Sequence, residues 1–466
     1  MRPLALLTLA VLFSGCAVGP NYHRPTVQAP PQYRGVDDPN QPAIPASLSD
    51  TKWFDLFKDE QLTVLVNGAL ARNYDLRIAS ARVLEARAQY GIQRADLFPT
   101  LGGDAQFNAA RISSIGTVLV PRGTDLAESY TQVGFTLGWE IDVWGRIRRL
   151  NESARAQYLS TEDARRGVIT TLFSDVTTAY FELREADMEL EIARQTRDIA
   201  EHSLKLTTLR RDRGVATSLD VHQAEQFLYT ATATIASAKR QVEQGENLLS
   251  FLIGDSPGPI VRGKSLNDFS TPPAVPAGLP SELLARRPDI RQAEEVLISA
   301  NADIGAAEAL YFPKITLTAF LGGQSRALSA LFTGPARQWT ITPDAAFPIF
   351  NAGRIRNQVR YSKAEKQEMI VSYEKAIQNA FREVSDSLVG YRRLSEQRAQ
   401  QELLVKALRD TDRLSTLRYR GGLDSYLQVL DAERNLFQGE LDLARLKRDE
   451  LDSIVALYRA LGGGWQ

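Results

Sequence analysis

The chain has 466 residues, more than one ordinary hydrophobic core holds, so length alone predicts two or three domains. Its 55 Lys and Arg residues nearly balance 56 Asp and Glu residues, so neither a nucleic-acid-binding surface nor an acidic tail is indicated. No apolar run beyond the N-terminus reaches the roughly 18 residues of a membrane-spanning helix. If the mature chain crosses a membrane, it must do so as a closed β-barrel, which satisfies every backbone group.

The N-terminus is typical of a secretory signal. A positive charge at Arg2 precedes an apolar stretch, and Ser14 and Gly15 precede the single cysteine, Cys16. This segment resembles a bacterial lipobox, with Phe13 where an aliphatic residue is usual. The lipobox would make Cys16 the mature N-terminus, an N-palmitoyl and S-diacylglycerol cysteine; the alternative is an ordinary signal peptide with a coincidental cysteine. Ala17, in place of the Asp typical of inner-membrane retention, favours sorting to the outer membrane.

The remaining N-terminal segment is rich in Pro, Gln and Ala, which predicts an extended tether. We therefore predict a signal peptide over residues 1–15 and a lipidated tether over residues 16–52. Three acyl chains would hold this tether firmly at a membrane, because each buried CH₂ contributes about 0.8 kcal/mol.

The rest of the chain is an internal repeat. Each half runs helix, Phe-Pro, strand, loop, strand, Gly-Arg, very long helix, Arg-Gly turn and long helix. The landmarks pair as Phe98-Pro99 with Phe312-Pro313, Gly145-Arg146 with Gly353-Arg354, Arg213-Gly214 with Arg420-Gly421, and Leu219–Glu225 with Leu427–Glu433. The repeats are predicted over residues 53–257 and 281–466, joined by a linker over 258–280.

Two predicted helices are unusually long. Residues 145–213 contain no proline, and a continuous helix there would reach roughly 100 Å at 1.5 Å per residue. Residues 353–420 predict a second helix of that kind. Apolar residues recur along both at helical spacing, which suits long helices packed side by side with one wet face. Periodicity by itself leaves an ordinary coiled-coil rod open.

Four segments alternate apolar and polar residues with period two, which predicts strands with one apolar face. Gln132–Trp144 alternates most strictly; Leu101–Ala109, Ile315–Leu321 and Trp339–Phe347 are the others. Their length of about ten residues suits membrane-spanning strands. The loops between them are predicted over Ser113–Glu128 and Gln324–Ala336.

Four strands cannot close a barrel, because the smallest outer-membrane barrels have about eight. An open sheet in lipid would leave two edges unsatisfied, so several copies must share one barrel. Two copies would supply eight strands around a nearly filled lumen, whereas three would supply twelve and leave an aqueous passage. Strand counting therefore favours a trimer for a conduit.

The residues from Gly278 to Ile290 resemble the block that opens the second repeat of outer-membrane efflux proteins, and Arg286-Arg287-Pro288-Asp289-Ile290 is its most specific part. The chain continues in the same pattern with Ala300–Gly305 and Phe312–Ile315. Trp53-Phe54 and Gly19–Tyr22 match the family in the first half. The chain is thus similar over its mature length to the lipoprotein branch of the TolC family, the OprM/NodT-like outer-membrane factors.

This resemblance implies a fold that is mainly α with a transmembrane β part. Each chain of a homotrimer would give four strands to a twelve-stranded β-barrel and long hairpins to a periplasmic α-barrel. The implied function is the exit duct of a tripartite efflux pump in a Gram-negative outer membrane, passing drugs or other small molecules outward. The implied partners are outer-membrane lipid, a periplasmic membrane-fusion adaptor and an inner-membrane resistance-nodulation-division pump. The alternatives are a type I protein-secretion duct and a periplasmic coiled-coil scaffold without a pore.

In this family the duct closes at the periplasmic ends of the hairpins, which the repeat places at Arg210–Leu219 and Arg418–Leu427. The candidate gate residues are Arg213, Tyr419, Arg420, Asp424 and Tyr426. Threefold symmetry would gather three copies of each near one axis. Our hypothesis is that Asp424 and Arg420 help to hold the closed end, with Tyr419 packing beside them. The alternative is that these are plain turn and capping residues.

The sequence predicts no enzyme. Its histidines, His23, His202 and His222, form no metal-binding spacing, and the Gly-Gly pairs at Gly102 and Gly322 lack the Lys-Ser/Thr of a phosphate loop. No Gly-x-Ser-x-Gly elbow occurs. We therefore predict no metal and no cofactor beyond the covalent lipid on Cys16.

Overall fold

A computed structural model of the protein describes residues 17–35, 47–113, 115, 121, 123, 125–269 and 276–465. The predicted signal peptide and Cys16 lie outside these residues. The longer elements are α2 (Trp53–Phe57), α3 (Glu60–Arg72), α4 (Tyr74–Ala95), β1 (Thr100–Arg111), β2 (Ala127–Ile141), α5 (Arg146–Asp212), α6 (Ser218–Leu252), α7 (Leu283–Arg286), α8 (Pro288–Ala309), β3 (Lys314–Ser325), β4 (Arg337–Ala346), α9 (Arg354–Arg420) and α10 (Tyr426–Ala460). Short 3₁₀ helices are η1 (Leu48–Asp50), η2 (Leu266–Asp268), η3 (Pro280–Glu282), η4 (Leu328–Ala330) and η5 (Gly334–Ala336).

The element order confirms the predicted alternation of helices and strands in both halves. The two very long helices are confirmed as well, because α5 and α9 are each continuous over 67 residues. Their apolar stripes are the buried ones: Val176, Tyr180, Ile377 and Val384 are all 0% exposed. Among the described residues, no helix combines the length and the hydropathy needed to cross a membrane.

By its contacts the chain divides into two compact units. Unit 1 comprises residues 1–25, 83–160 and 293–373, and unit 2 comprises residues 26–82, 161–292 and 374–466. Each unit draws on both sequence repeats, since α5 and α9 contribute residues to both units.

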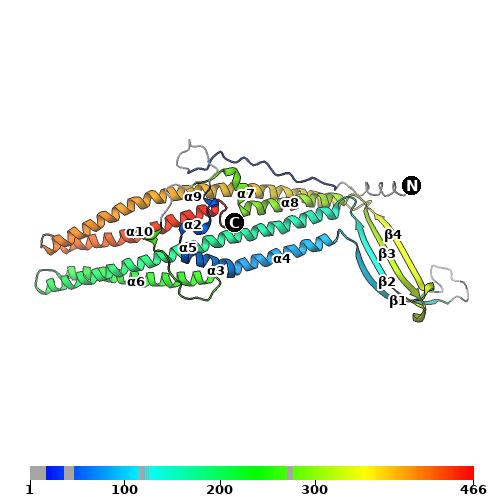
Figure 1. Cartoon of the computed structure of the whole chain (residues 1–466), viewed down its shortest axis with the longest axis horizontal. Coiled ribbons are helices and arrows are strands. Elements are labelled where there is room, and N and C mark those ends of the chain that lie inside the picture. The colour runs from blue at the N-terminus through cyan, green and yellow to red at the C-terminus, as the bar shows by residue number, and fades with distance from the viewer. Residues whose placement is uncertain are drawn as a thin grey trace. The chain divides into compact units, whose positions relative to one another are not determined.

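Unit 1 contains one antiparallel sheet with the strands in chain order, β1-β2-β3-β4 (Figure 1). In its register Val133 lies opposite Ala105 and Gly323, which places residues of equal parity on one face. We call this face the apolar row; it includes Leu101, Phe107, Phe135, Leu137, Trp139, Leu317, Leu321, Trp339 and Ile341. The opposite face includes Asp104, Gln106, Gln132, Thr136, Glu140, Thr318, Gln338 and Thr342. The predicted two-faced strands are therefore confirmed.

The predicted strand Gln132–Trp144 is wrong at its C-terminal end, because β2 stops at Ile141. The Asp142 carboxylate instead accepts hydrogen bonds from the backbone N–H groups of Ile147 and Arg148, at 3.0 and 2.9 Å. Asp142 thus supplies acceptors to the otherwise unpaired N–H groups that begin α5. Similarly, Phe347 lies beyond β4.

The N-terminal segment that follows Cys16 is fastened to unit 1. The Val18 N–H donates to the Trp144 carbonyl at 2.9 Å, and the buried Arg149 side chain donates to the Val18 carbonyl at 3.2 Å and to Asn21 Oδ1 at 2.9 Å. Farther along, Arg24 forms a bidentate ion pair with Glu294, in which Nε donates to Oε1 and Nη2 donates to Oε2, both at 2.6 Å. Residues predicted to be an extended tether are therefore held against the region where β2 ends and α5 begins.

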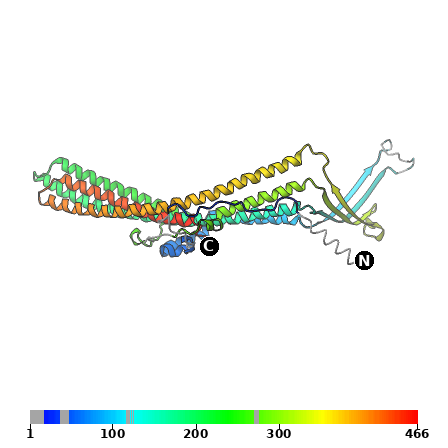
Figure 2. The same ribbon diagram turned by 90° about the horizontal axis from the view of Figure 1, so that it is seen from above.

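Unit 2 contains two antiparallel helix pairs, formed by the later part of α5 with α6 and by the later part of α9 with α10 (Figures 1 and 2). One apolar cluster draws on all four helices, with Ala193 and Ala200 from α5, Phe227 from α6, Tyr419 from α9 and Phe437 from α10. The rings of Phe227 and Phe437 meet edge to face at 6.3 Å between centroids. The two pairs thus share a core.

Candidate functional site

The first hairpin end lies where α5 turns into α6. The chain reverses at Gly214, whose φ of +75° is readily adopted only by glycine, and the Val215 N–H returns to the Arg210 carbonyl at 2.8 Å. Thr217 then caps α6, and its side chain and that of Asp220 bond each other's backbone N–H groups. The turn itself is therefore held by local backbone and capping hydrogen bonds.

The second hairpin end, between α9 and α10, has the same backbone turn. Gly422 has a φ of +76°, and the Leu423 N–H returns to the Arg418 carbonyl at 2.9 Å. These bonds make Gly422 the equivalent of Gly214 and Arg418 the equivalent of Arg210. The predicted pairing of Arg213-Gly214 with Arg420-Gly421 is therefore wrong by one residue, since Gly421 precedes the glycine that turns.

An ion pair spans the second turn. Arg418 Nε lies 2.5 Å from Asp424 Oδ2, and Arg418 Nη2 lies 3.1 Å from Asp424 Oδ1. The hydrogen bonds from Arg418 lower the pKa of Asp424. Within the described chain Arg420 and Arg213, which the sequence nominated, form no ion pair. Asp424 is thus paired with Arg418 inside its own chain.

The two hairpins meet through Arg210 and Tyr419. The Arg210 guanidinium stacks 4.2 Å from the centroid of the Tyr419 ring, and its Nη1 donates to the Tyr419 carbonyl at 3.3 Å. The centroids of the Tyr419 and Tyr426 rings lie 5.6 Å apart. Both rings are buried, and neither hydroxyl has a hydrogen-bond partner among the described residues. Burial raises the pKa of Tyr426.

A carboxylate is buried in the same contact. Glu433 on α10 is 6% exposed and accepts a hydrogen bond from Ser203 on α5 at 2.9 Å. Its second oxygen, Oε2, has no partner among the described residues. Burial raises the pKa of Glu433 to about 7, and the negative charge of Asp412 adds to the shift. A group that titrates near neutral pH therefore lies between the two hairpins.

Sequence reasoning found Tyr419, Tyr426 and Asp424 at this end but missed Arg210, Ser203, Arg418 and Glu433. Glu433 did carry a signal, because it closes the repeated segment Leu427–Glu433. Its counterpart Glu225 is partly exposed and pairs with the exposed His222 at 2.8 Å. The repeat thus marks both glutamates and does not say which is buried.

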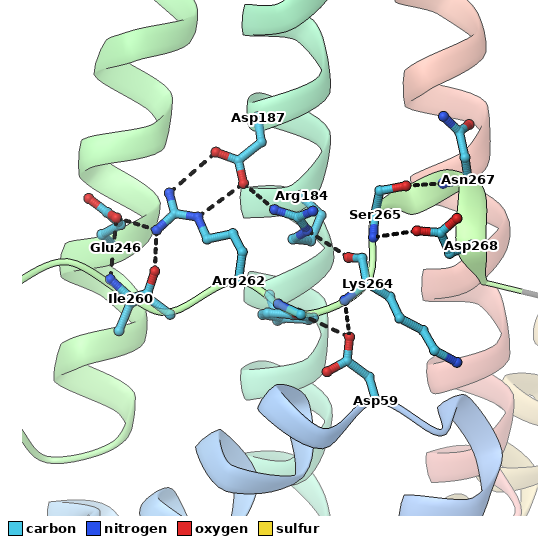
Figure 3. A network of polar contacts seen from close by, with 12 residues as sticks. Asp59, Arg184, Asp187, Glu246, Ile260, Arg262, Lys264, Ser265, Asn267 and Asp268 are labelled. Carbon is cyan, nitrogen blue, oxygen red and sulfur yellow. Dashed lines mark hydrogen bonds and ion pairs between the residues drawn. The ribbon is translucent and has the colours of Figure 1, made fainter.

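A second polar network in unit 2 fastens the segment after α6 (Figure 3). Arg262 bridges Asp187 on α5, at 3.1 Å, and Glu246 on α6. The side chain of Arg184 donates to Asp187 at 2.6 Å and to the Lys264 carbonyl at 2.9 Å. This part of the predicted linker is therefore held by ion pairs to both helices of the first hairpin.

Asp59 is the buried end of that network. It caps α3 by accepting from the Leu62 N–H at 3.0 Å, and its other oxygen accepts from the Lys264 N–H at 2.8 Å and the Tyr180 hydroxyl at 3.1 Å. Burial raises the pKa of Tyr180 to about 12. Asp59 thus joins the start of α3 to α5 and to the segment that follows α6.

Comparisons with known proteins agree with this architecture. A family model described as outer membrane efflux protein matches residues 65–255 and 279–463. The chain is 40% identical over 470 residues to the solvent efflux pump outer membrane protein SrpC of Pseudomonas putida, covering 100% of this chain and 98% of the relative. It is 34% identical over 469 residues to the cation efflux system protein CusC of Escherichia coli O6:H1, covering 100% of both.

Among solved structures, the open state of the Neisseria gonorrhoeae MtrE outer membrane channel matches with a TM-score of 0.87 and 32% identity. That match covers 97% of this chain and 99% of MtrE. The chain therefore belongs to the outer membrane efflux protein family.

Proposed function

We propose that this chain is the outer-membrane exit duct of a tripartite efflux pump, and that three copies share one twelve-stranded barrel. The observation that carries the proposal is the four-stranded sheet. Phe135, Leu321 and Trp339 on its apolar row are 62, 63 and 72% exposed. Its outer strands, β1 and β4, each have only one partner among the described strands. A lipid-facing row and two edges that need partners suit a sheet completed by copies of itself.

The chain has the TolC-like fold, and its family supplies the outer-membrane channels of tripartite pumps. An adaptor and an inner-membrane pump are therefore the partners in this proposal, with a resistance-nodulation-division pump as its type. SrpC is named for solvent efflux and CusC for cation efflux, so relatives with one fold serve different cargoes. In our proposal the pump selects the cargo, and the duct catalyses no reaction.

The experiment compares two arginine substitutions on neighbouring residues of β2. Phe135→Arg places a charge on the apolar row, at a cost of about 2–4 kcal/mol near the centre of a bilayer. Thr136→Arg, the matched control, places it on the polar face. We expect wild type and Thr136→Arg to form heat-resistant trimers that conduct ions in a planar bilayer, and Phe135→Arg to lose both. Equal behaviour of the two variants, or a wild type that does not conduct, would overturn the proposal.

The lipid anchor on Cys16 is part of the proposal. The segment that follows it is tied to Trp144 just beyond the end of β2, which supports an acyl chain entering the membrane beside the sheet. Mass spectrometry of the mature N-terminal peptide should find diacylglycerol and palmitate on Cys16. An unmodified peptide beginning at another residue would contradict the anchor.

The gate is also part of the proposal: the hairpin ends close the duct, and Asp424 helps to hold them. Asp424 pairs with Arg418 of its own turn, yet 25% of its side chain stays exposed, and this exposure supports a contact between copies at this end. Arg420, which has no ion pair within the described chain, is the cation that we assign to such a contact with a neighbouring Asp424. We expect Asp424→Ala to open more often in bilayer recordings than Asp410→Ala, a matched loss of an exposed carboxylate. Unchanged opening statistics would remove Asp424 from the gate.

A further inference from the structure

The loop between β3 and β4 folds back onto the sheet. Leu331, in this loop, is 4% exposed. A Cβ added at Gly323 would overlap the Leu331 carbonyl oxygen, so the loop lies on the side toward which a Gly323 side chain would point. Because Gly323 lies opposite Val133, that side is the apolar row. The loop thus covers part of the face that the proposed function turns toward lipid.

Between this loop and the strands is an apolar hollow of about 590 Å³. Its walls include small residues of the apolar row, Gly103, Ala105 and Gly323, and the loop residues Leu331 and Phe332. Small residues among the large ones of the apolar row leave a depression, and the loop covers it. The hollow has the apolar lining of a site for an acyl chain.

One cation lines the hollow. Arg337 is the first residue of β4 and lies opposite Gly323, on the apolar row. Within the described part of the chain its guanidinium has neither an ion pair nor a side-chain hydrogen bond. An unpaired guanidinium on a lipid-facing row is unfavourable unless a phosphate or water meets it.

The strand register gives the depth of this cation. The eight residue steps from Val133 to Ile141, at about 3.3 Å each, span about 26 Å along β2. A strand tilted by about 40° covers about 20 Å of this along the membrane normal. The apolar band of an outer-membrane barrel is about 25 Å tall. Arg337 therefore lies near the outer end of the band, where lipid phosphates are found. Phe332 and Leu328 on the same loop are 86 and 71% exposed, as side chains at a membrane interface are.

We propose that this hollow binds a phosphorylated glycolipid of the outer leaflet, with an acyl chain between loop and sheet and a phosphate on Arg337. The inference rests on the proposed function, because it needs the apolar row to face lipid. The continuity of the hollow with that row and the single cation at headgroup depth favour a lipid over a protein partner.

The test is native mass spectrometry of the full-length protein in detergent, titrated with bisphosphorylated lipid A. We expect Arg337→Gln to bind about tenfold more weakly, as the loss of one charge-assisted guanidinium–phosphate contact implies. The matched control is Arg326→Gln, which removes the same charge from the same loop, where Arg326 pairs with Glu128 at 3.0 Å. We expect this control to bind within about twofold of wild type.

A second pair of variants tests the hollow without changing charge. Ala105→Leu fills it, whereas Ala109→Leu adds the same side chain to the same row of β1 outside it. We expect only Ala105→Leu to weaken lipid A binding several-fold, since it occupies the space for the chain.

Equal binding by Arg337→Gln and wild type would overturn the proposal, and so would phosphatidylglycerol binding as tightly as lipid A. Ion conductance of the same samples separates this inference from the proposed function. If the variants conduct normally and bind lipid A like wild type, the lipid site alone is overturned. A wild type that does not conduct would overturn the proposed duct.

Discussion

At the two hairpin ends one backbone turn carries different side chains. Gly214 and Gly422 adopt nearly the same positive φ, and Arg210 and Arg418 accept equivalent backbone hydrogen bonds. Arg210 nevertheless reaches across to Tyr419 of the other hairpin, whereas Arg418 pairs with Asp424 of its own turn. Equivalent arginines thus join the hairpins in one case and brace a single turn in the other.

The start of the second helix differs in the same sense. Thr217 caps α6 with its side chain, whereas Ser425 makes no such bond at the start of α10. In its place α10 begins with Tyr426, which is buried against Tyr419, while the equivalent Ser218 of α6 is exposed. The first end is therefore stabilised by local hydrogen bonds and the second by aromatic packing. A repeat can preserve a turn while its two copies take different roles.

The largest expected effect on stability comes from the buried Tyr426 at the second hairpin end. Tyr426→Ala should lower the free energy of local opening at the start of α10 by about 3–5 kcal/mol, because it empties a buried ring-sized volume. Native-state hydrogen exchange of the α10 amides measures it. Ser218→Ala, at the equivalent position of α6, should change the free energy of local opening at the start of α6 by less than about 0.5 kcal/mol. Similar losses at both ends would show that the second end is not held by packing.

A smaller, pH-dependent effect on the free energy of local opening should come from Glu433 and not from its counterpart Glu225. Burial raises the pKa of Glu433 to about 7, above its ordinary value, so the closed hairpins hold the neutral acid. The stabilisation is complete below the ordinary carboxyl pKa and is lost as the pH rises through about 7. Local opening of the contact that buries Glu433 should cost about 2–3 kcal/mol less at pH 8 than at pH 5, as measured by hydrogen exchange at both pH values.

Glu433→Gln should remove this pH dependence, because the amide stays neutral and still accepts from Ser203. Glu225→Gln is the control, since Glu225 pairs with His222 on the surface. The assignment fails if Glu433→Gln keeps the pH dependence of wild type.

The smallest expected effect concerns the caps. Thr217→Ala removes a reciprocal capping bond and should lower the free energy of opening of the first turn of α6 by about 1 kcal/mol. Ser425→Ala should change the first turn of α10 by no more than a few tenths, because its side chain caps nothing. Exchange rates of the amides in the two first turns measure both. A larger loss for Ser425→Ala than for Thr217→Ala would contradict the assignment of the side-chain cap to α6 alone.

The sequence alone determined the elements whose cause is local. The absence of proline predicted the continuous α5 and α9, period-two alternation predicted which strand residues share a face, and the repeat located both hairpin ends. Each of these depends on a residue and its near neighbours, so a single sequence carries the signal.

The partners and the burial of individual side chains were decided only by the tertiary structure. It gave Asp424 the partner Arg418, ended β2 at Ile141, and buried Glu433 while leaving its repeat partner Glu225 partly exposed. Helical periodicity shows that a face is apolar but not which helix will cover it. Whether a glutamate in such a face is neutral and buried or charged and solvent-exposed therefore depends on which helix packs against it.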